Sequence, residues 1–216
     1  MNDIKRYRYR MLYSKTEAMR YTSHLDLHRT WERSLRRAGL PLAYSQGYNP
    51  RPRLNLGHAL PLGYTSDYEL ADFWLETLID SKELRRTIRP ALPPGLRLHE
   101  VSLYPARQPA LQQQIASCVY KIRLEDSPDD ATLQTAIERL IQAEILPRIR
   151  RGKSYNLRPL IETIDLQPVQ GHMGLVMQLS AREGRTGRPD EVLLEMGLDP
   201  THAHIHRTQQ VLQQTT

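Results

Sequence analysis

Two halves of this sequence share landmarks at a nearly constant separation, and that spacing restricts the possible folds more than any single motif does. The pattern Tyr-Asn-x-Arg-Pro at residues 48–52 returns at residues 155–159, about 107 positions later. Glu32 and Glu138, each followed by an arginine, lie about 106 positions apart. Matching offsets of this kind indicate an internal duplication, and a repeat outweighs local assignments of secondary structure.

The predicted elements come in the same order in both halves. In the first half, hydrophobic patterning predicts strand, helix, strand, strand, helix and strand over residues 7–13, 23–38, 54–62, 68–76, 81–91 and 96–103. In the second half, the same order falls on residues 118–124, 128–143, 155–167, 174–180, 190–196 and 205–212. A further extended piece is expected at residues 19–22, and the first strand is expected to carry one wet, basic face.

This element order is typical of the split βαβ, or ferredoxin-like, fold. We therefore expect an α+β protein with two tandem ferredoxin-like (βαββαβ) domains that arose by internal duplication. The first domain is expected over residues 1–106 and the second over residues 117–216. Residues 107–116, which are rich in glutamine and lack apolar periodicity, are expected to form the linker.

The composition favours a polyanionic partner. The 216 residues carry a net charge of +6 with a pI of about 9.5, and arginine outnumbers lysine about five to one. Arginine suits bidentate phosphate contacts and stacking on bases, which makes RNA the expected partner, with a small anionic ligand as the alternative.

The cysteine content and the lengths of the apolar runs argue against a disulfide-stabilised protein, an iron–sulfur protein, a membrane protein and a secreted protein. The single cysteine, Cys118, permits no internal disulfide, and the chain alone has too few thiolates for an iron–sulfur cluster. No stretch is apolar over the roughly 18 residues of a membrane helix, and residues 1–10 lack the apolar core of a signal peptide. We expect a cytoplasmic protein without a membrane segment or a cofactor.

The segment at residues 44–53 is expected to be a stiff loop. Gly47 permits a positive φ, while Pro50 and Pro52 fix their own φ and favour extended neighbours. Such a loop holds Tyr48 and Arg51 outward with little loss of entropy on binding. The alternative is a rigid turn that only leads into the next strand.

Three further basic segments join this loop in the predicted RNA-binding surface: one face of helix 23–38, the turn at 148–153 and the turn at 182–189. The last has glycines between arginines but lacks the lysine and spacing of a P-loop, so we reject a nucleotide hydrolase. Arginines would contact phosphates and tyrosines would stack on unpaired bases. The candidate residues are Arg29, Arg33, Arg36, Arg37, Tyr44, Tyr48, Asn49, Arg51, Arg53, Arg151, Lys153, Tyr155, Asn156, Arg158, Arg185 and Arg188.

Histidines offer weaker signals. His24 and His28 are four apart on a predicted helix, and His202, His204 and His206 alternate on a predicted strand. Both spacings suit metal ligands, but capping, core or solvent-facing histidines are commoner, and we expect no metal site. His24 with Tyr44, Tyr48 and the loop arginines could instead cleave RNA at a 2′-hydroxyl without metal, with His24 as the general base.

The run from Met19 to Leu27, followed by the segment from Glu32 to Pro52, resembles a bacterial radical-SAM-associated family of unassigned function. Members occur alone or fused C-terminal to a cobalamin-binding radical SAM protein. Residues 155–159 and 187–191 resemble later motifs of that family, whereas His28 stands where relatives usually carry an apolar residue. The resemblance implies a radical SAM partner and a setting near RNA-processing and ribosomal genes.

The expected function is thus a non-catalytic RNA-binding accessory protein that works with a separate radical SAM enzyme in tRNA or rRNA modification or processing. One alternative is a metal-independent endoribonuclease with His24 as general base, and duplicated ferredoxin-like folds in CRISPR-type RNA-processing endoribonucleases provide an analogy of fold for it. The other alternative is a protein–protein docking module for the radical SAM enzyme.

Overall fold

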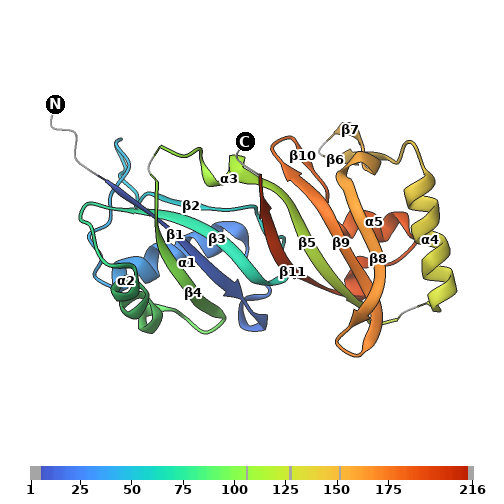
Figure 1. Cartoon of the computed structure of the whole chain (residues 1–216), viewed down its shortest axis with the longest axis horizontal. Coiled ribbons are helices and arrows are strands. Elements are labelled where there is room, and N and C mark those ends of the chain that lie inside the picture. The colour runs from blue at the N-terminus through green and yellow to red at the C-terminus, as the bar shows by residue number, and fades with distance from the viewer. Residues whose placement is uncertain (1–5, 106, 127, 151, 214–216) are drawn as a thin grey trace. The chain divides into compact units, whose positions relative to one another are not determined.

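The structure is a computed structural model that describes residues 6–213 except 106, 127 and 151. The chain combines helices with antiparallel strands (Figure 1), so the predicted α+β class is confirmed. The chain divides into two compact units at Gln114 and Ile115. Within the described residues, no helix is long and apolar enough to span a membrane.

The first unit is built around an antiparallel sheet. Its elements are β1 (Tyr7–Lys15), α1 (His24–Arg37), β2 (Leu54–Leu56), β3 (Thr65–Leu75), α2 (Ser81–Ile88) and β4 (Leu96–Tyr104). The strands lie in the order β2-β3-β1-β4, and each is antiparallel to its neighbours. Two 3-10 turns, η1 (Glu17–Met19) and η2 (Arg89–Ala91), follow β1 and α2. The extended piece expected at residues 19–22 is therefore wrong, and β2 is shorter than predicted.

Helix α1 follows directly from its sequence pattern. The Ser23 hydroxyl caps it by accepting a hydrogen bond from Asp26 N at 3.2 Å. Leu27, Trp31 and Leu35, spaced by four residues, lie on one face and are buried. Those side chains pack into one hydrophobic core with α2 and with one face of the sheet.

The second unit repeats the same element order with an insertion. Its main elements are β5 (Ile115–Leu124), α4 (Asp130–Gln142), β8 (Ile161–Val169), β9 (His172–Arg182), α5 (Pro189–Glu195) and β11 (Ala203–Leu212). The strands lie in the order β8-β9-β5-β11, and all these pairs are antiparallel. A 3-10 turn, η4 (Pro200–His202), precedes β11.

A short hairpin and a 3-10 turn are inserted between α4 and β8. They consist of β6 (Pro147–Arg150), β7 (Lys153–Asn156) and η3 (Arg158–Leu160). The two-residue strand β10 (Arg185–Thr186) folds back on the end of β9. The single strand predicted at residues 155–167 is therefore wrong, because η3 breaks it after Asn156.

The expected linker region lies against the first unit. It contains α3 (Leu111–Gln114), and Leu111 is fully buried. Arg8 Nη1 donates a hydrogen bond to Gln108 O at 2.8 Å, and Arg8 Nη2 donates one to Pro109 O at 2.9 Å. Gln112 Nε2 donates to Leu56 O at 2.6 Å. Residues 108–114 are thus a packed part of the first unit.

Candidate nucleic-acid interface

Residues 42–54 form a hairpin, here called the tyrosine hairpin, whose base is fixed by backbone hydrogen bonds. Arg53 N donates to Ala43 O, and Ser45 N donates to Arg51 O, both at 2.8 Å. The base is also joined to β3, because Ala43 N donates to Trp74 O at 2.8 Å and Trp74 N donates to Arg53 O at 3.2 Å. The chain therefore enters and leaves the loop at fixed points on the sheet.

The tip of the tyrosine hairpin presents predicted contact residues to solvent. The Tyr48 side chain is fully exposed (101%), and Tyr44 at the base is exposed by 38%. Arg51 is exposed as well, and within the part of the chain that the structure describes its guanidinium has no hydrogen-bond or ion-pair partner. An exposed aromatic ring and an unpaired guanidinium in one fixed loop suit base stacking and phosphate binding.

A cavity of about 470 Å³ opens at the base of this hairpin, within the first unit. Arg8, Arg51, Arg53 and Trp74 are among its lining residues. The guanidinium carbon of Arg53 lies 5.0 Å from the Trp74 ring centroid, and that of Arg8 lies 5.5 Å from it. Burial lowers the pKa of the Arg53 guanidinium, and the positive charge of Arg6 adds to this effect. An anion in the cavity would therefore relieve an existing crowding of positive charge.

Arg8 and Arg10 are buried, which corrects the expectation that the basic face of β1 is wet. They are only 3% and 8% exposed, and both contact the fully buried carboxylate of Asp72. Arg10 also lies over the Tyr104 ring, with its guanidinium carbon 3.7 Å from the centroid. One carboxylate thus stands between two guanidinium groups, which leaves a net positive charge beside the cavity.

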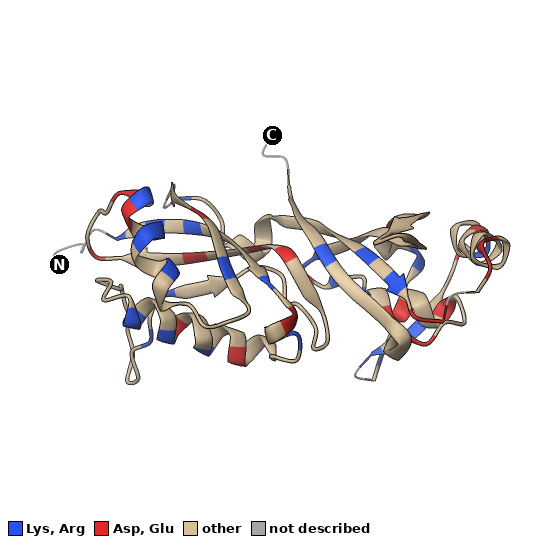
Figure 2. Ribbon diagram, turned by 90° about the horizontal axis from the view of Figure 1, so that it is seen from below, with Lys and Arg blue, Asp and Glu red and all other residues tan. Residues whose placement is uncertain are grey.

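The four predicted arginines of α1 are all exposed, and the ribbon in Figure 2 carries several basic positions along a helix. Arg29 Nη1 donates to Asp26 Oδ1 at 3.2 Å, and Arg37 Nη1 donates to Ala91 O at 3.3 Å. Arg33 and Arg36 are therefore the members of this set that are more available to an added anion.

The second copy of the Tyr-Asn-x-Arg-Pro pattern uses its residues differently. Asn156 Oδ1 accepts hydrogen bonds from Leu146 N at 2.8 Å and from Arg158 N at 3.0 Å. Arg158 donates from Nε to Ile141 O in α4 and from Nη1 to Ile161 O in β8, both at 3.1 Å. These side chains fasten their own turn to the unit, whereas their counterparts in the tyrosine hairpin face solvent.

Tyr155, the first residue of that copy, belongs to a network with Arg150 and Glu191. Arg150 donates to Glu191 from Nε at 3.0 Å and from Nη2 at 2.5 Å, and Nη2 also lies 3.4 Å from the Tyr155 hydroxyl. Burial raises the pKa of Tyr155 to about 12, and its hydrogen bond to Glu191 adds to the rise. Burial opposes the charge of Arg150, but the bonds to Glu191 outweigh it and raise the pKa of that guanidinium. The phenol is thus protonated near neutral pH and the ring is held in place.

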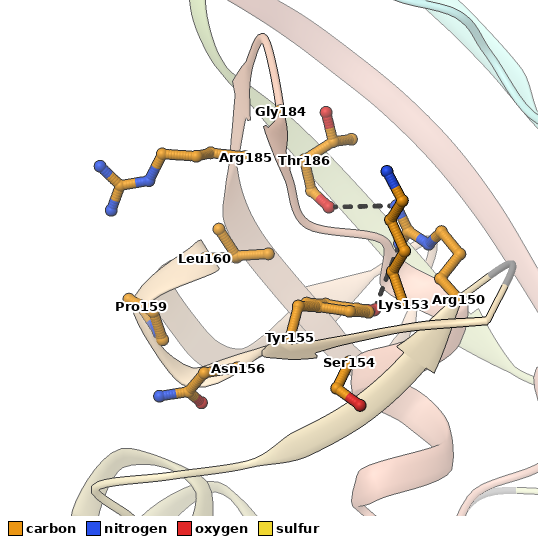
Figure 3. Close-up of a pocket in the computed structure, with 10 residues that line it drawn as sticks. All are labelled: Arg150, Lys153, Ser154, Tyr155, Asn156, Pro159, Leu160, Gly184, Arg185 and Thr186. Carbon is orange, nitrogen blue, oxygen red and sulfur yellow. Dashed lines mark hydrogen bonds between the residues drawn. The ribbon is translucent and has the colours of Figure 1, made fainter.

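A second cavity, of about 530 Å³, opens beside Tyr155 within the second unit (Figure 3). It brings together four of the predicted residues: Lys153, Tyr155, Asn156 and Arg185. Arg150 also lines it, although sequence reasoning selected Arg151 and Lys153 from this basic run instead.

Two other predicted residues of the second unit, Arg158 and Arg188, do not line this cavity. Arg188 forms an ion pair with Asp190, from Nε to Oδ1 at 2.9 Å, and is not among the lining residues. Arg151 lies outside the described residues.

The candidate histidines lie on three elements, α1, η4 and β11. Among the described residues, no group of three or more His, Cys, Asp or Glu side chains is placed to hold a metal ion. His202 Nδ1 lies 3.3 Å from Asp126 Oδ2, and His28 Nε2 lies 3.1 Å from Leu54 O. His24 is the first residue of α1, while Tyr48 makes no hydrogen bond within the described part of the chain, so no His24–Tyr48 pair is preformed.

The fold and these cavities define an α+β protein of two compact units, each with a basic, aromatic-lined cavity of its own. The chain belongs to the DUF2344 family, which is described as an uncharacterized protein conserved in bacteria, and residues 8–189 match the family. The match begins in β1 and ends at the start of α5, so it includes residues of both units. No curated protein matches the chain.

Proposed function

We propose that the protein is a non-catalytic RNA-binding accessory protein and that the tyrosine hairpin is its main contact with unpaired RNA. The observation that carries this proposal is the fully exposed Tyr48 on a hairpin that is fastened to β3, together with Arg51 of the same hairpin, whose guanidinium has no partner among the described residues. Bases of any identity stack on exposed tyrosine rings, and arginines bind the phosphates between them.

The charge around the hairpin supports the same conclusion. Among the described residues, the cavity at its base is lined by three arginines and by no acidic residue. The carboxylate nearest to Arg8, that of Asp72, is already shared with Arg10. A phosphate at this point would therefore meet uncompensated positive charge, and its binding should weaken steeply with salt.

We propose further that both units are ferredoxin-like folds related by duplication. Support comes from the two strand orders, β2-β3-β1-β4 and β8-β9-β5-β11, since each places the first and third strands of its unit side by side at the centre. The repeated landmarks in the sequence agree with this interpretation. The motif has then kept the same residue types in both copies, but its asparagine and arginine are exposed in the first copy and half-buried in the second.

The proposed partner is a radical SAM enzyme that acts on the bound RNA, a tRNA or an rRNA, in modification or processing. This part of the proposal rests on the family resemblance of the segments 19–27 and 32–52. The accessory protein would supply RNA affinity, and the enzyme would supply the chemistry. The expected place of this work is the cytoplasm.

The test is the affinity for short single-stranded RNA, measured by fluorescence anisotropy over a series of salt concentrations. Tyr48→Ala should weaken binding by about 1–3 kcal/mol, or roughly five- to 140-fold, because it removes one stacking platform. Arg51→Gln should reduce the slope of log K against log salt by about 0.7, the value for one phosphate contact on a single strand. Arg86→Gln, an exposed arginine of α2, is the matched control and should change neither quantity. Salt-independent or undetectable binding by the wild-type protein would overturn the proposal.

A second candidate function, docking to the enzyme without RNA, is favoured by exposed apolar residues elsewhere in the first unit. Tyr21 and Leu62 are 74% and 59% exposed, and they are neighbours because Gly63 N donates to Arg20 O at 3.1 Å. A complex with the radical SAM enzyme that resists both salt and nuclease, and that Tyr21→Ser weakens while Tyr48→Ala does not, would replace RNA binding by this function.

A further inference from the structure

We propose that the cavity of the second unit binds a single nucleotide, with the base beside Tyr155 and the phosphate between Lys153 and Arg185. This inference deepens the proposed function and rests on it, because it assigns to the second unit a site for one nucleotide rather than a surface for a strand. Free nucleoside monophosphates and an unpaired nucleotide at an RNA end offer the same chemistry.

The first support is the size and shape of the cavity. Its volume of about 530 Å³ falls in the range of ~300–1,000 Å³ typical of small-molecule sites. Its walls come from two separate turns, the β9–β10 hairpin on one side and the segment from β7 to η3 on the other. Figure 3 shows Lys153 rising from β7 toward the β9–β10 hairpin and the Tyr155 ring running toward Arg150, while Arg185 extends to the opposite side of the view and Ser154 points away from the space between the walls.

The second support is an aromatic and apolar floor with a fixed orientation. Tyr155, Pro159 and Leu160 supply it. The Tyr155 ring is held by the hydrogen bonds of its hydroxyl in the network with Arg150 and Glu191. A ring that is already oriented loses little entropy when a base stacks on it.

The third support is the balance of charge at the rim. Arg150 is neutralised by its two hydrogen bonds to Glu191. Lys153 and Arg185 are exposed, and neither forms an ion pair or side-chain hydrogen bond within the described ranges. Among the residues that the structure describes, none that lines the cavity is acidic. Two uncompensated cations on opposite walls suit a doubly charged phosphate better than a single carboxylate.

The remaining polar groups indicate little selection among bases. Asn156 is committed to Leu146 N and Arg158 N, and Thr186 Oγ1 donates to Arg182 O at 3.4 Å. Neither side chain is therefore available to read the edge of a base without giving up its own bond. We expect the site to accept purine and pyrimidine nucleotides with similar affinity.

The test is isothermal titration calorimetry of the intact protein with adenosine and uridine monophosphates, with the two nucleosides and with inorganic phosphate. Both monophosphates should bind saturably and more tightly than either fragment. Arg185→Gln and Lys153→Gln should each weaken the binding about five- to tenfold, since each removes one charged contact. Arg182→Gln is the matched control, because this exposed arginine lies on the same hairpin but does not line the cavity.

Two ring variants test the stacking. Tyr155→Phe should retain most of the monophosphate affinity, whereas Tyr155→Leu should lose at least about fivefold. A circular dichroism spectrum and melting curve of each variant would show whether the unit is still folded. If Tyr155→Leu is unfolded, the monophosphate affinities of Arg185→Gln and Arg182→Gln decide whether the cavity is the binding site.

Two comparisons make the result specific. The first distinguishes a failure of this site from a failure of the proposed RNA function, and the second distinguishes a free nucleotide from an RNA end as the ligand. Monophosphate binding that is unchanged by Arg51→Gln shows a site independent of the tyrosine hairpin, even if RNA affinity fails its own test. A 5′-phosphorylated RNA that competes for the site far better than a monophosphate identifies the RNA end as the source, and equal competition identifies the free nucleotide. No saturable monophosphate binding, or binding that Arg182→Gln weakens as much as Arg185→Gln, would overturn the proposal.

Discussion

Arg8 donates two hydrogen bonds to one carboxylate oxygen of Asp72, from Nε at 2.9 Å and from Nη2 at 2.5 Å. The second oxygen of that carboxylate accepts from Arg10 Nε at 2.8 Å. The same Arg8 guanidinium binds the carbonyl oxygens of Gln108 and Pro109, so the buried charges of β1 and β3 also fasten the segment that follows β4.

Loss of the central carboxylate should therefore be costly. Asp72→Asn leaves two buried guanidinium groups without a counter-charge, and we expect it to lower the free energy of unfolding by about 3–5 kcal/mol. Urea unfolding followed by circular dichroism measures this change. Glu76→Gln, just beyond β3 and exposed, is the control and should stay within about 0.5 kcal/mol of wild type. An Asp72→Asn protein as stable as this control would show that the ion pairs do not hold the unit together.

The two copies of the Tyr-Asn-x-Arg-Pro pattern should respond oppositely to the same mutation. Arg158→Ala removes two hydrogen bonds to backbone carbonyls, so stability should fall by about 1–3 kcal/mol while RNA affinity stays the same. Arg51→Ala should weaken RNA binding and leave the melting temperature unchanged, because no described group bonds its guanidinium. Thermal melts and anisotropy titrations on both variants check the contrast. Equal losses of RNA affinity in Arg158→Ala and Arg51→Ala would contradict this prediction.

Gly95 should tolerate no side chain. Its φ is +95°, and an added Cβ would lie 2.5 Å from Met19 Cγ and 2.9 Å from Met19 N. Gly95→Ala should destabilise the protein by about 2–4 kcal/mol, through backbone strain and the clash together. Gly197→Ala is the comparison, since its φ is +79° and nothing lies within 4 Å of the added Cβ. That variant should be destabilised by the backbone strain alone, about 1–2 kcal/mol. Equal losses in the two proteins would mean that Met19 moves aside freely.

The raised pKa of Tyr155 predicts a specific response to alkali. Its folded value of about 12 lies above the ordinary value of 10.0, so between these values the folded protein holds a proton that the unfolded chain has lost. The contribution of Tyr155 to the free energy of unfolding is fully present when the pH is below the ordinary pKa of 10.0. This contribution should fall as the pH rises toward the folded pKa of about 12. Urea midpoints over this pH window would show the fall, and Tyr155→Phe should flatten it. A wild-type curve parallel to that of Tyr155→Phe would mean that the shift is absent.

The local sequence pattern was sufficient to predict those helices and strands whose residues interact mainly with near neighbours in the sequence. The cap Ser23 and the stripe of Leu27, Trp31 and Leu35 interact within a few residues or with a continuous core, so α1 was readable from its spacing. The strands of the second unit were readable for the same reason, except at residues 155–167. There the turn η3 depends on bonds from Asn156 and Arg158 to partners up to 17 positions away.

The candidate site was harder to predict for the same physical reason. Arg8 and Arg10 look like a wet basic face, and only Asp72, more than 60 positions away, explains their burial. Arg150 was missed because its partner Glu191 is 41 positions away. The exposed tip of the tyrosine hairpin needed no distant partner, and its exposure followed from the glycine and prolines of the loop.

The contact between Arg53 and Trp74 gives the protein an intrinsic fluorescent probe of ligand binding. The chain has two tryptophans, and Trp31 is fully enclosed in the core of the first unit, whereas Trp74 lines the cavity under the tyrosine hairpin. A ligand that draws the Arg53 guanidinium from the indole would alter the fluorescence of Trp74 and leave the emission of Trp31 as a constant background. Occupancy of this cavity can thus be followed on the unlabelled molecule.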